Sequence, residues 1–302
     1  MTLIVADIGG SHIRLGRPVE GHDPEVLARL PTPVDDWALF CTVIGDALRA
    51  MATPATALSI SIAGVVSTET GKVTAANIPC INGRPLAQDL SDVLGLPVAV
   101  TNDADCAALA ESRVGAGAGH GVVFCAILGT GVGGGLVVNG QLVRGAGGLT
   151  GEWGHAPIVN EAEVLNGDGR RVRVPRFKCG CGLMGCADTV GGARGLERLH
   201  AFLHQAEQTS HQILDAWTAG DASATATVHA YVELLSGPLA LVVNVTGASV
   251  VPVSGGLSRC APLIAALDAA VRQQILRRSD RVLVVPSALT EAGLIGAAFA
   301  FG

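Results

Sequence analysis

One local pattern occurs twice in this chain, about 120 residues apart. Near the N-terminus, an apolar run ends in the turn Asp7-Ile8-Gly9-Gly10-Ser11, and the residues after it alternate polar and apolar, which is the period of a strand. From residue 122, a second apolar run ends in a turn at residues 129–135, and Asn139-Gly140 then marks a hairpin. A repeated strand–turn–strand unit is typical of a distant internal duplication. We therefore expect an α/β protein built from two mixed sheets.

Apolar spacing predicts the elements that join and follow these two copies. Trp37, Phe40, Ile44 and Leu48 share one face of a helix predicted over residues 35–51. We expect further helices over residues 85–94, 104–113, 190–207 and 224–244 and at the C-terminus, and strands over residues 58–62, 97–100, 249–253 and 281–285. Residues 159–178 form a polar insertion.

Length, charge and composition exclude several classes of protein. The chain has 302 residues, enough for two cores, and a formal charge of −6 with no basic stripe, which argues against a nucleic-acid-binding protein. The N-terminus has no basic region and reaches an acid at Asp7, so we expect no signal peptide. Residues 234–258 carry no charge, but Gly237, Pro238 and Pro252 interrupt them; a buried helix, a turn and a core strand fit better than a membrane span. We expect a cytoplasmic protein without membrane contact.

Both glycine turns suit a phosphate group, because backbone N–H groups without side chains can approach it closely. Residues 129–134 formally match the G-x-G-x-x-G pattern of dinucleotide sites, but a hairpin follows instead of the required helix, so the Rossmann interpretation fails. The sequence contains no Walker A loop. Either turn alone is as well explained by a tight hairpin; their repetition at equivalent places favours two phosphate-binding turns.

Asp103 is the candidate general base. Phosphoryl transfer to an alcohol needs a carboxylate within reach of the attacking hydroxyl and Mg2+ on the phosphates. Asp103 follows a predicted strand and begins a predicted helix, and Asp105, two residues later, points elsewhere. By itself this position also suits an ordinary helix cap, so the surrounding motifs must decide between the two roles.

Three of the eight cysteines lie within eight residues, at Cys179, Cys181 and Cys186, with glycines that permit a tight wrap. In a reducing compartment, clustered thiols bind metal more often than they pair. His155 is the best fourth ligand for a closed tetrahedral zinc site, which would be structural and would fix Glu152 and its loop. The alternative is a reactive thiol cluster of a redox sensor.

Together these motifs resemble the bacterial ROK family, which comprises repressors, open reading frames and sugar kinases. The resemblance covers essentially the whole length and is carried by the Asp7–Ser11 turn, Asn102-Asp103, Gly129–Gly135, Gly151-Glu152-x-Gly-His155 and Cys-x-Cys-Gly-x-x-Gly-Cys. Within the family, residues 30–33, 75–79, 83–86 and 127–130 and the insertion before Cys179 resemble the subgroup that phosphorylates N-acetylglucosamine. The family implies the actin/hexokinase-like (ribonuclease H-like) duplicated fold with a cleft between two domains, here residues 1–115 plus 287–302 and residues 116–286.

The resemblance also implies roles for individual residues. Asp103 would be the general base for the sugar 6-hydroxyl. The expected sugar contacts are Gly64, Asn77, Asn102, Asp103, Glu152, His155 and Asp188. The expected ATP contacts are Asp7, Gly9, Gly10, Ser11, His12, Gly129, Thr130, Gly131, Gly133, Gly134, Gly255 and Gly256. His155, Cys179, Cys181 and Cys186 would hold structural Zn2+, Mg2+ would accompany ATP, and the family suggests a homodimer.

The chain departs from the family pattern at four places. Ser11 stands where Thr is usual, and Ala63-Gly64 replaces the common Pro-Gly. Asp188 stands where the family usually has a sugar-binding Glu, and Gly191-Gly192 replaces Ser-Gly. The shorter Asp188 puts sugar affinity and sugar choice in question.

Three functions compete. The first is an ATP-dependent hexose kinase for the 6-hydroxyl of N-acetyl-D-glucosamine, with glucose, N-acetylmannosamine or allose as alternative substrates. The second is a repressor of the same family, which needs a helix-turn-helix ahead of the first glycine turn; Asp7 lies too near the start for one. The third is a non-catalytic sugar-binding protein, against which Asp103 and both turns argue.

Overall fold

The computed structural model describes residues 2–156, 163–165, 169–276 and 280–301. Contacts divide the chain into two compact units. The first comprises Met1–Val114, Gly135–Thr150 and Leu289–Gly302, and the second comprises Gly115–Gly134 and Gly151–Ala288. The domain boundaries expected from the sequence stay a prediction; this contact grouping differs from them chiefly in placing residues 135–150 with the first unit.

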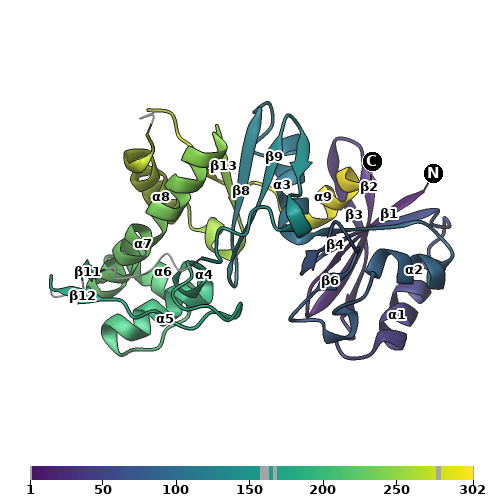
Figure 1. The fold of residues 1–302 in the computed structure, drawn as a ribbon, viewed down its shortest axis with the longest axis horizontal. Coiled ribbons are helices and arrows are strands. Elements are labelled where there is room, and N and C mark those ends of the chain that lie inside the picture. Colours follow the sequence, from purple (N-terminus) through teal and green to yellow (C-terminus); the bar gives the residue numbers. More distant parts are fainter. Residues whose placement is uncertain (1, 157–162, 166–168, 277–279, 302) are drawn as a thin grey trace. The chain divides into compact units, whose positions relative to one another are not determined.

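Two five-stranded sheets dominate the structure (Figure 1). The strands of the first are β1 (Leu3–Ile8), β2 (His12–Val19), β3 (His22–Pro31), β4 (Ala57–Ile62) and β7 (Val98–Asn102). The strands of the second are β8 (Val122–Leu128), β9 (Val132–Val138), β10 (Gln141–Val143), β13 (Val251–Ser254) and β14 (Val284–Pro286). Two short pairs are β5 (Val65–Val66) with β6 (Val73–Thr74) and β11 (Glu163–Leu165) with β12 (Arg171–Arg173).

The helices among the described residues connect and flank these strands. The α-helices are α1 (Trp37–Arg49), α2 (Leu86–Leu94), α3 (Asp103–Val114), α4 (Asp188–Gly191), α5 (Ala193–His204), α6 (Ser210–Thr218), α7 (Ala222–Thr246), α8 (Ala261–Gln274) and α9 (Ala292–Ala300). The 3-10 turns are η1 (Pro79–Ile81), η2 (Ala146–Gly148) and η3 (Gly256–Arg259).

The two sheets share one strand order, which supports the duplication read from the sequence. The order is β3-β2-β1-β4-β7 in the first sheet and β10-β9-β8-β13-β14 in the second. In each sheet three consecutive strands form one side, and two later strands add next to the earliest of the three, β1 or β8. In the first sheet β1, β4 and β7 are parallel; in the second β8, β13 and β14 are parallel. The predicted Asn139-Gly140 hairpin joins β9 to β10, with both turn residues at positive φ.

Alternation along β1 gives the first sheet a core on each face. Ile4, Ala6 and Ile8 pack with side chains of α1 and α2, whereas Val5 packs with Cys106 of α3 and with α9. This is the two-residue period of a strand covered on both sides. Figure 1 shows α1 and α2 together on one side of these strands and α9 on the other. Asp7 shares the parity of Val5, so its side chain faces α9.

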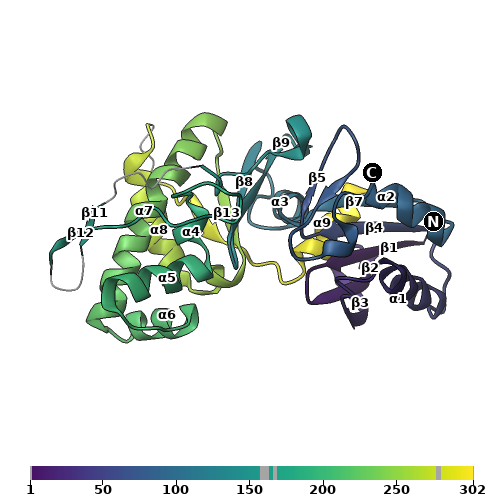
Figure 2. The ribbon, with the colours of Figure 1, turned by 60° about the horizontal axis from the view of Figure 1, so that its bottom comes forward.

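The core of the second unit contains α7, which spans most of the uncharged stretch. By length and composition this helix could cross a membrane, but 67% of its apolar window is buried inside the structure. Gly247 ends it at positive φ and β13 follows, so the expected helix, turn and strand are confirmed. Helix α7 packs against α8, and α8 contacts β14, the strand next to β13; the two helices lie side by side in both views (Figures 1 and 2).

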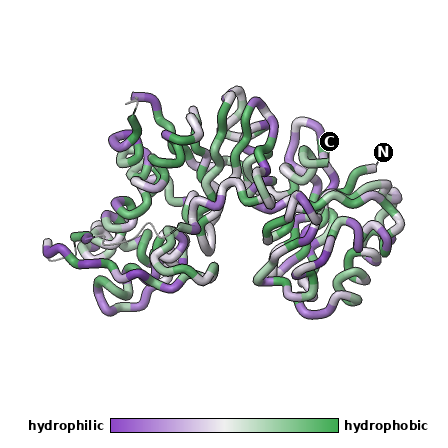
Figure 3. The backbone as a smooth tube through the Cα atoms, viewed as in Figure 1, coloured by the Kyte–Doolittle hydropathy of each residue, from purple (hydrophilic) through white to green (hydrophobic). Residues whose placement is uncertain are grey.

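Three elements differ from the expectation. Strand β3 was not predicted, because an edge strand with Pro24 and exposed polar residues lacks a clear apolar period. The single helix expected over residues 190–207 is two helices, α4 and α5, separated by Gly192 in an extended conformation. Helix α6 was not predicted either. Within the described residues, the polar insertion contains the antiparallel pair of β11 and β12, which is coloured partly hydrophilic and partly hydrophobic in Figure 3.

Candidate active site

The carboxyl ends of three parallel strands meet at one edge of the first sheet. Ile8 of β1 is in register with Ile62 of β4, and Ile62 with Asn102 of β7. The segments that follow these strands hold Gly9-Gly10, Gly64 and Asp103. In open α/β sheets this edge is where ligands bind. These four predicted site residues therefore lie just beyond the same edge of the sheet.

The first glycine turn is closed by its own backbone and by Thr32. The Gly9 N–H donates to the His12 carbonyl at 3.0 Å, and the Thr32 hydroxyl donates to the Gly9 carbonyl at 2.7 Å. A side chain at Gly10 would lie 3.1 Å from Cβ of Asn77, so the structure brings these two predicted residues together. Ser11 and His12 are exposed at the tip of the turn.

Asp7 is held from several sides below this turn. Its carboxylate pairs with Arg14 of β2 and accepts a hydrogen bond from the Ser61 hydroxyl at 2.8 Å. Gly293 of α9 packs against it so closely that a Cβ would come within 2.5 Å of an Asp7 oxygen. Arg14 also pairs with Glu291 at 2.7 Å. Arg14, Ser61 and Glu291 were not among the predicted site residues. Arg14 lies directly opposite Asp7 in the antiparallel pair of β1 and β2, so the predicted strand–turn–strand unit carries a signal for this contact.

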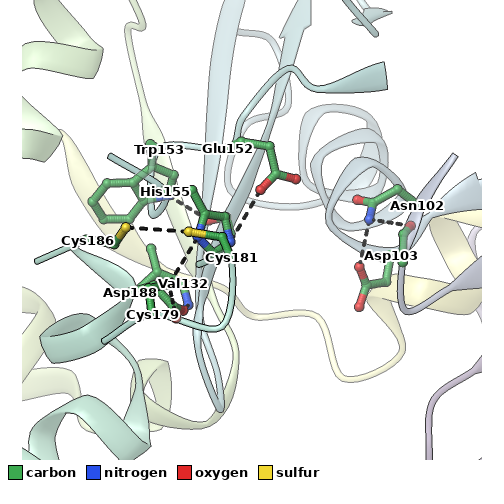
Figure 4. A network of polar contacts seen from close by, with 12 residues as sticks. Asn102, Asp103, Val132, Glu152, Trp153, His155, Cys179, Cys181, Cys186 and Asp188 are labelled. Atoms are coloured by element: carbon green, nitrogen blue, oxygen red, sulfur yellow. Dashed lines mark hydrogen bonds and ion pairs between the residues drawn. The ribbon is translucent and has the colours of Figure 1, made fainter. Parts of the chain in front are cut away.

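Asn102 and Asp103 share the capping of α3. Asn102 Oδ1 accepts from the N–H groups of Ala104 at 2.9 Å and Asp105 at 3.1 Å, and its Nδ2 donates to the Gly64 carbonyl at 2.9 Å. Asp103 is the first residue of the helix and is exposed; its Oδ1 accepts from the Ala104 N–H at 2.9 Å and from Asn102 Nδ2 at 3.2 Å (Figure 4). A capping contact of Asp103 is therefore present, and its exposure is the feature that an ordinary cap does not require.

The second glycine turn joins β8 to β9 and is packed on almost every side. The Gly129 N–H donates to the Gly131 carbonyl at 3.1 Å. Trp153 Nε1 donates to the Gly133 carbonyl at 2.6 Å, and a Cβ at Gly134 would lie 2.8 Å from Phe124 and 2.9 Å from the Cys125 carbonyl. Thr130 alone is exposed. Glycine is required at Gly134 because neighbouring backbone and side-chain atoms leave no space for a Cβ.

Gly255 and Gly256 lie beside this turn. They follow β13, whose Ser254 is in register with Ile127 of the parallel strand β8. Gly255 has φ +94°, and a Cβ there would lie 2.6 Å from the Leu128 carbonyl and 2.7 Å from the Gly129 nitrogen. Two of the predicted nucleotide-binding segments are thus adjacent within the second unit.

The predicted metal ligands converge. The ligand atoms of His155, Cys179, Cys181 and Cys186 all lie within 4.8 Å of one another. Cys181 Sγ is 3.7 Å from Cys186 Sγ, and Cys179 Sγ is 3.6 Å from His155 Nδ1 (Figure 4). Two sulfurs bound to one tetrahedral zinc ion, each at about 2.3 Å, lie about 3.8 Å apart. The donor set and its spacing therefore fit a Cys3His zinc ion.

Glycine turns and local electrostatics shape this cluster. Gly182 and Gly185 have φ of +93° and +78°, which lets the Cys179 N–H reach the Leu183 carbonyl at 2.9 Å. A backbone hydrogen bond at Leu183 lowers the pKa of the exposed Cys181 thiol to about 7, while burial raises the pKa of Cys179 to about 12. Metal binding would deprotonate all three thiols, so it competes with protons.

Glu152 approaches the other nitrogen of the same histidine. His155 Nε2 lies 3.7 Å from Glu152 Oε2, while Nδ1 faces the cysteines. A carboxylate beside the non-ligating nitrogen orients a metal-bound histidine. Burial raises the pKa of Glu152, the charge of His155 opposes that shift, and Asp188 adds to it. Glu152 and His155 are each about one third exposed, so both remain accessible to a ligand.

Asp188 begins α4 and faces the glycine turn. Its Oδ1 accepts the Val132 N–H at 2.8 Å, and its Oδ2 lies 3.6 Å from Cys179 Sγ. Its own N–H donates to the Gly154 carbonyl at 2.9 Å. The structure therefore places this predicted sugar contact between the metal cluster and the second glycine turn.

Comparison with known proteins gives one family. The profile of the ROK family matches residues 4–301. N-acetyl-D-glucosamine kinase of Shigella flexneri serotype 5b (strain 8401) is 35% identical over 256 residues, which are 83% of this chain and 83% of that protein. The ROK hexokinase of Thermus thermophilus superposes with a TM-score of 0.82 at 28% identity, over 99% of this chain and 97% of that one.

A second solved structure adds a bound nucleotide. The ROK family glucokinase of Streptomyces griseus, in complex with glucose and AMPPNP, has a TM-score of 0.79 and 27% identity, over 99% of this chain and 98% of that one. The expected actin/hexokinase-like fold is confirmed by these neighbours and by the two sheets.

Proposed function

Since the chain belongs to the ROK family and is a sugar kinase of that family, we propose that it transfers the terminal phosphoryl group of ATP to the 6-hydroxyl of N-acetyl-D-glucosamine. One observation above the others supports this proposal. Asp103 is an exposed carboxylate directly after the carboxyl end of β7, on the edge where three parallel strands end. A carboxylate at the strand ends of an α/β sheet is well placed to act as a general base on a ligand bound there.

In the proposed reaction, Asp103 accepts the proton of the 6-hydroxyl as its oxygen attacks the γ-phosphorus. The new O–P bond forms while the bond from phosphorus to the bridging β–γ oxygen breaks, and ADP leaves with that electron pair. Mg2+ bound to the phosphates would neutralise part of their charge. The remaining residues position the two substrates, which is the larger part of catalysis in phosphoryl transfer.

We assign the sugar contacts to Gly64, Asn77, Asn102 and Asp103 in the first unit and to Glu152 and His155 in the second. We assign the ATP phosphates to the two glycine turns and Gly255-Gly256. Support comes from the open space at Gly9 and Gly256, where a Cβ would meet nothing within 4 Å, and from the nucleotide analogue bound to the Streptomyces griseus relative. His155 and the three cysteines would hold zinc, which would keep Glu152 in place and would take no part in the chemistry.

The test is an ADP-release assay with MgATP against N-acetylglucosamine, N-acetylmannosamine, glucose, fructose and allose. We expect the highest kcat/KM with N-acetylglucosamine. Preference for glucose would keep the kinase and move the substrate to that of the Streptomyces griseus relative. Turnover with none of these sugars would contradict the proposal and favour a sugar-binding protein.

We also propose that the protein works in the cytoplasm as a homodimer. Eight free cysteines suit a reducing compartment, where ATP is available. The dimer rests on the family resemblance. Light scattering behind size exclusion would give the mass in solution, and a mass near 30.5 kDa would contradict the dimer.

A further inference from the structure

Helices α4 and α5 begin on the second glycine turn instead of merely lying near it. The Ala193 N–H donates to the Gly129 carbonyl at 2.8 Å, and the Arg194 N–H donates to the Thr130 carbonyl at 3.4 Å. Asp188 adds the third bond, accepted from the Val132 N–H at 2.8 Å. The turn is therefore held by the segment that immediately follows Cys186.

This close approach depends on three glycines. A Cβ at Gly131 would lie 2.4 Å from Asp188 Oδ1, and one at Gly192 would lie 2.5 Å from the Thr130 carbonyl. A Cβ at Gly191 would lie 2.6 Å from a methyl group of Val132. Such distances do not occur in real structures, so a side chain at any of the three positions would force the helices and the turn apart.

The side chain of Asp188 reaches two partners. Its Oδ1 accepts the Val132 N–H at 2.8 Å, and its Oδ2 lies 3.6 Å from Cys179 Sγ. One carboxylate oxygen therefore faces the glycine turn and the other faces the cysteine cluster.

We propose that Asp188 is a positioning residue that ties the Gly129–Gly134 turn to the cysteine cluster, and that it is not a sugar ligand in this chain. The metal at that cluster would then support the nucleotide turn as well as the loop that carries Glu152. This inference rests on the proposed function, because that function assigns the turn to ATP.

The decisive measurement is ADP affinity by calorimetry, with the metal-loaded and the chelator-treated protein. Asp188→Ala should weaken ADP binding about tenfold through loss of a hydrogen bond to a charged acceptor. Asp188→Asn should retain most of the affinity, because the amide oxygen still accepts the Val132 N–H. Stripping the metal should weaken ADP binding to the wild-type protein and add little in Asp188→Ala, since both changes cut the same connection.

Two further variants separate this role from sugar binding. Asp188→Glu should weaken ADP binding as alanine does, with N-acetylglucosamine binding changed less than about threefold. Tighter sugar binding in Asp188→Glu with ADP affinity unchanged would overturn the inference. Asp215→Ala, on the exposed face of α6, is the matched control and should alter neither ligand nor melting temperature.

The measurements also distinguish this inference from the proposed function. A wild-type protein that binds no ADP contradicts the proposed function. In that case the rate of metal release to a chelator tests whether Asp188 supports the cysteine cluster. Asp188→Ala should release the metal faster than the wild-type protein, by about 10- to 100-fold, the range typical of residues that support metal ligands. Equal release rates and equal ADP affinities in wild type and Asp188→Ala would overturn the inference.

Discussion

The two glycine turns occupy equivalent places in the two sheets, after β1 and after β8, but they are held in different ways. The first is closed by its own backbone and by Thr32, and a Cβ at Gly9 would meet nothing within 4 Å. The second is held by Trp153, Asp188 and the start of α5. The same strand order therefore holds two different turns. Hydrogen bonds within residues 9–32 close the first turn, whereas residues 153–194 hold the second.

The difference follows from what the second half inserts. Between β3 and β4 the first half has α1, whereas between β10 and β13 the second half has the metal loop and helices α4 to α7. The inserted residues pack onto the turn and make it dependent on them. The halves also differ after their last strand. In the second half a loop separates β14 from α9, and Glu291 at the start of α9 pairs with Arg14. In the first half β7 leads directly into the exposed carboxylate of Asp103.

The largest effect is expected from removing that carboxylate. Asp103→Asn keeps the size of the side chain but cannot take the proton, so kcat should fall by about 10²- to 10⁴-fold with sugar binding largely retained. ADP release and sugar calorimetry measure the two quantities. Asp92→Asn, on the exposed face of α2, is the control. Loss of sugar binding together with a lower melting temperature would make Asp103 structural.

Cys181→Ser tests whether the second turn depends on the metal loop. We expect the variant to lose its metal, and turnover to fall about 10- to 100-fold because the ligand-bearing loops relax. Elemental analysis gives the metal content, and hydrogen exchange should rise around Val132 but not around Gly9. Cys260→Ser, outside the cluster, is the control. Unchanged metal content would refute the zinc assignment.

A methyl group at Gly134 tests the packing of the second turn. The added carbon would press on Phe124 and on the Cys125 carbonyl, and such overpacking costs about 1–3 kcal/mol of unfolding free energy. Denaturant titration of Gly134→Ala measures this loss. A variant as stable as the wild-type protein would show that the turn can shift away from Phe124 and Cys125. The second turn would then be no more tightly packed than the first.

A buried histidine should make the second unit more sensitive to acid. Burial, with a smaller contribution from His204, lowers the pKa of His200, which is 1% exposed and 2.8 Å from the Thr227 hydroxyl. Neutral, buried His200 stabilises the folded state fully at pH values above the pKa of an unfolded histidine, about 6.5. As the pH falls from there toward the lowered pKa of the folded state, the unfolded chain binds more protons and this stabilisation is lost. Hydrogen exchange in α5 and α7 should rise over this range, and less so in His200→Gln. His12 and His22 of the first unit are exposed, so β1 and β2 serve as the internal reference.

The smallest effect is expected at the first turn. Gly9→Ala places a methyl group in open space, so the free energy of unfolding should change by less than about 0.5 kcal/mol. Comparing its KM for ATP with that of wild type shows whether ligand needs this space. A large loss of stability would mean that the first turn is packed like the second.

The sequence predicted those parts of the fold that local patterns determine. Apolar runs and glycine turns located β1 and β8, and the helical period located α1 to within two residues at each end. Edge strand β3 was not predicted, because an edge strand has a weak apolar period. The break between α4 and α5 at Gly192 was not predicted either, because it accompanies a contact with Thr130, about 60 residues earlier in the chain.

In the candidate site, too, the sequence predicted the features that depend on local spacing and did not predict those that depend on long-range contacts. The cysteine spacing predicted that His155 and the three cysteines lie together, and they do, because three of the four lie within one short loop; that they bind metal stays a prediction. The contacts of Arg14 and Ser61 with Asp7, and of Asp188 with Val132, depend on strand register and helix placement. No local spacing encodes such contacts, and the family resemblance assigned Asp188 to the sugar instead.

The packing of α9 on α3 has a consequence for synthesis on the ribosome. A Cβ at Gly296 would lie 1.9 Å from the Cys106 carbonyl, so the two helices meet backbone to backbone directly behind the Asn102-Asp103 corner. The first unit therefore waits for residues 289–301, which follow the whole second unit along the chain. A nascent chain stalled before α9 should lack the support behind Asn102-Asp103 and should expose Val5 and Cys106 to chaperones.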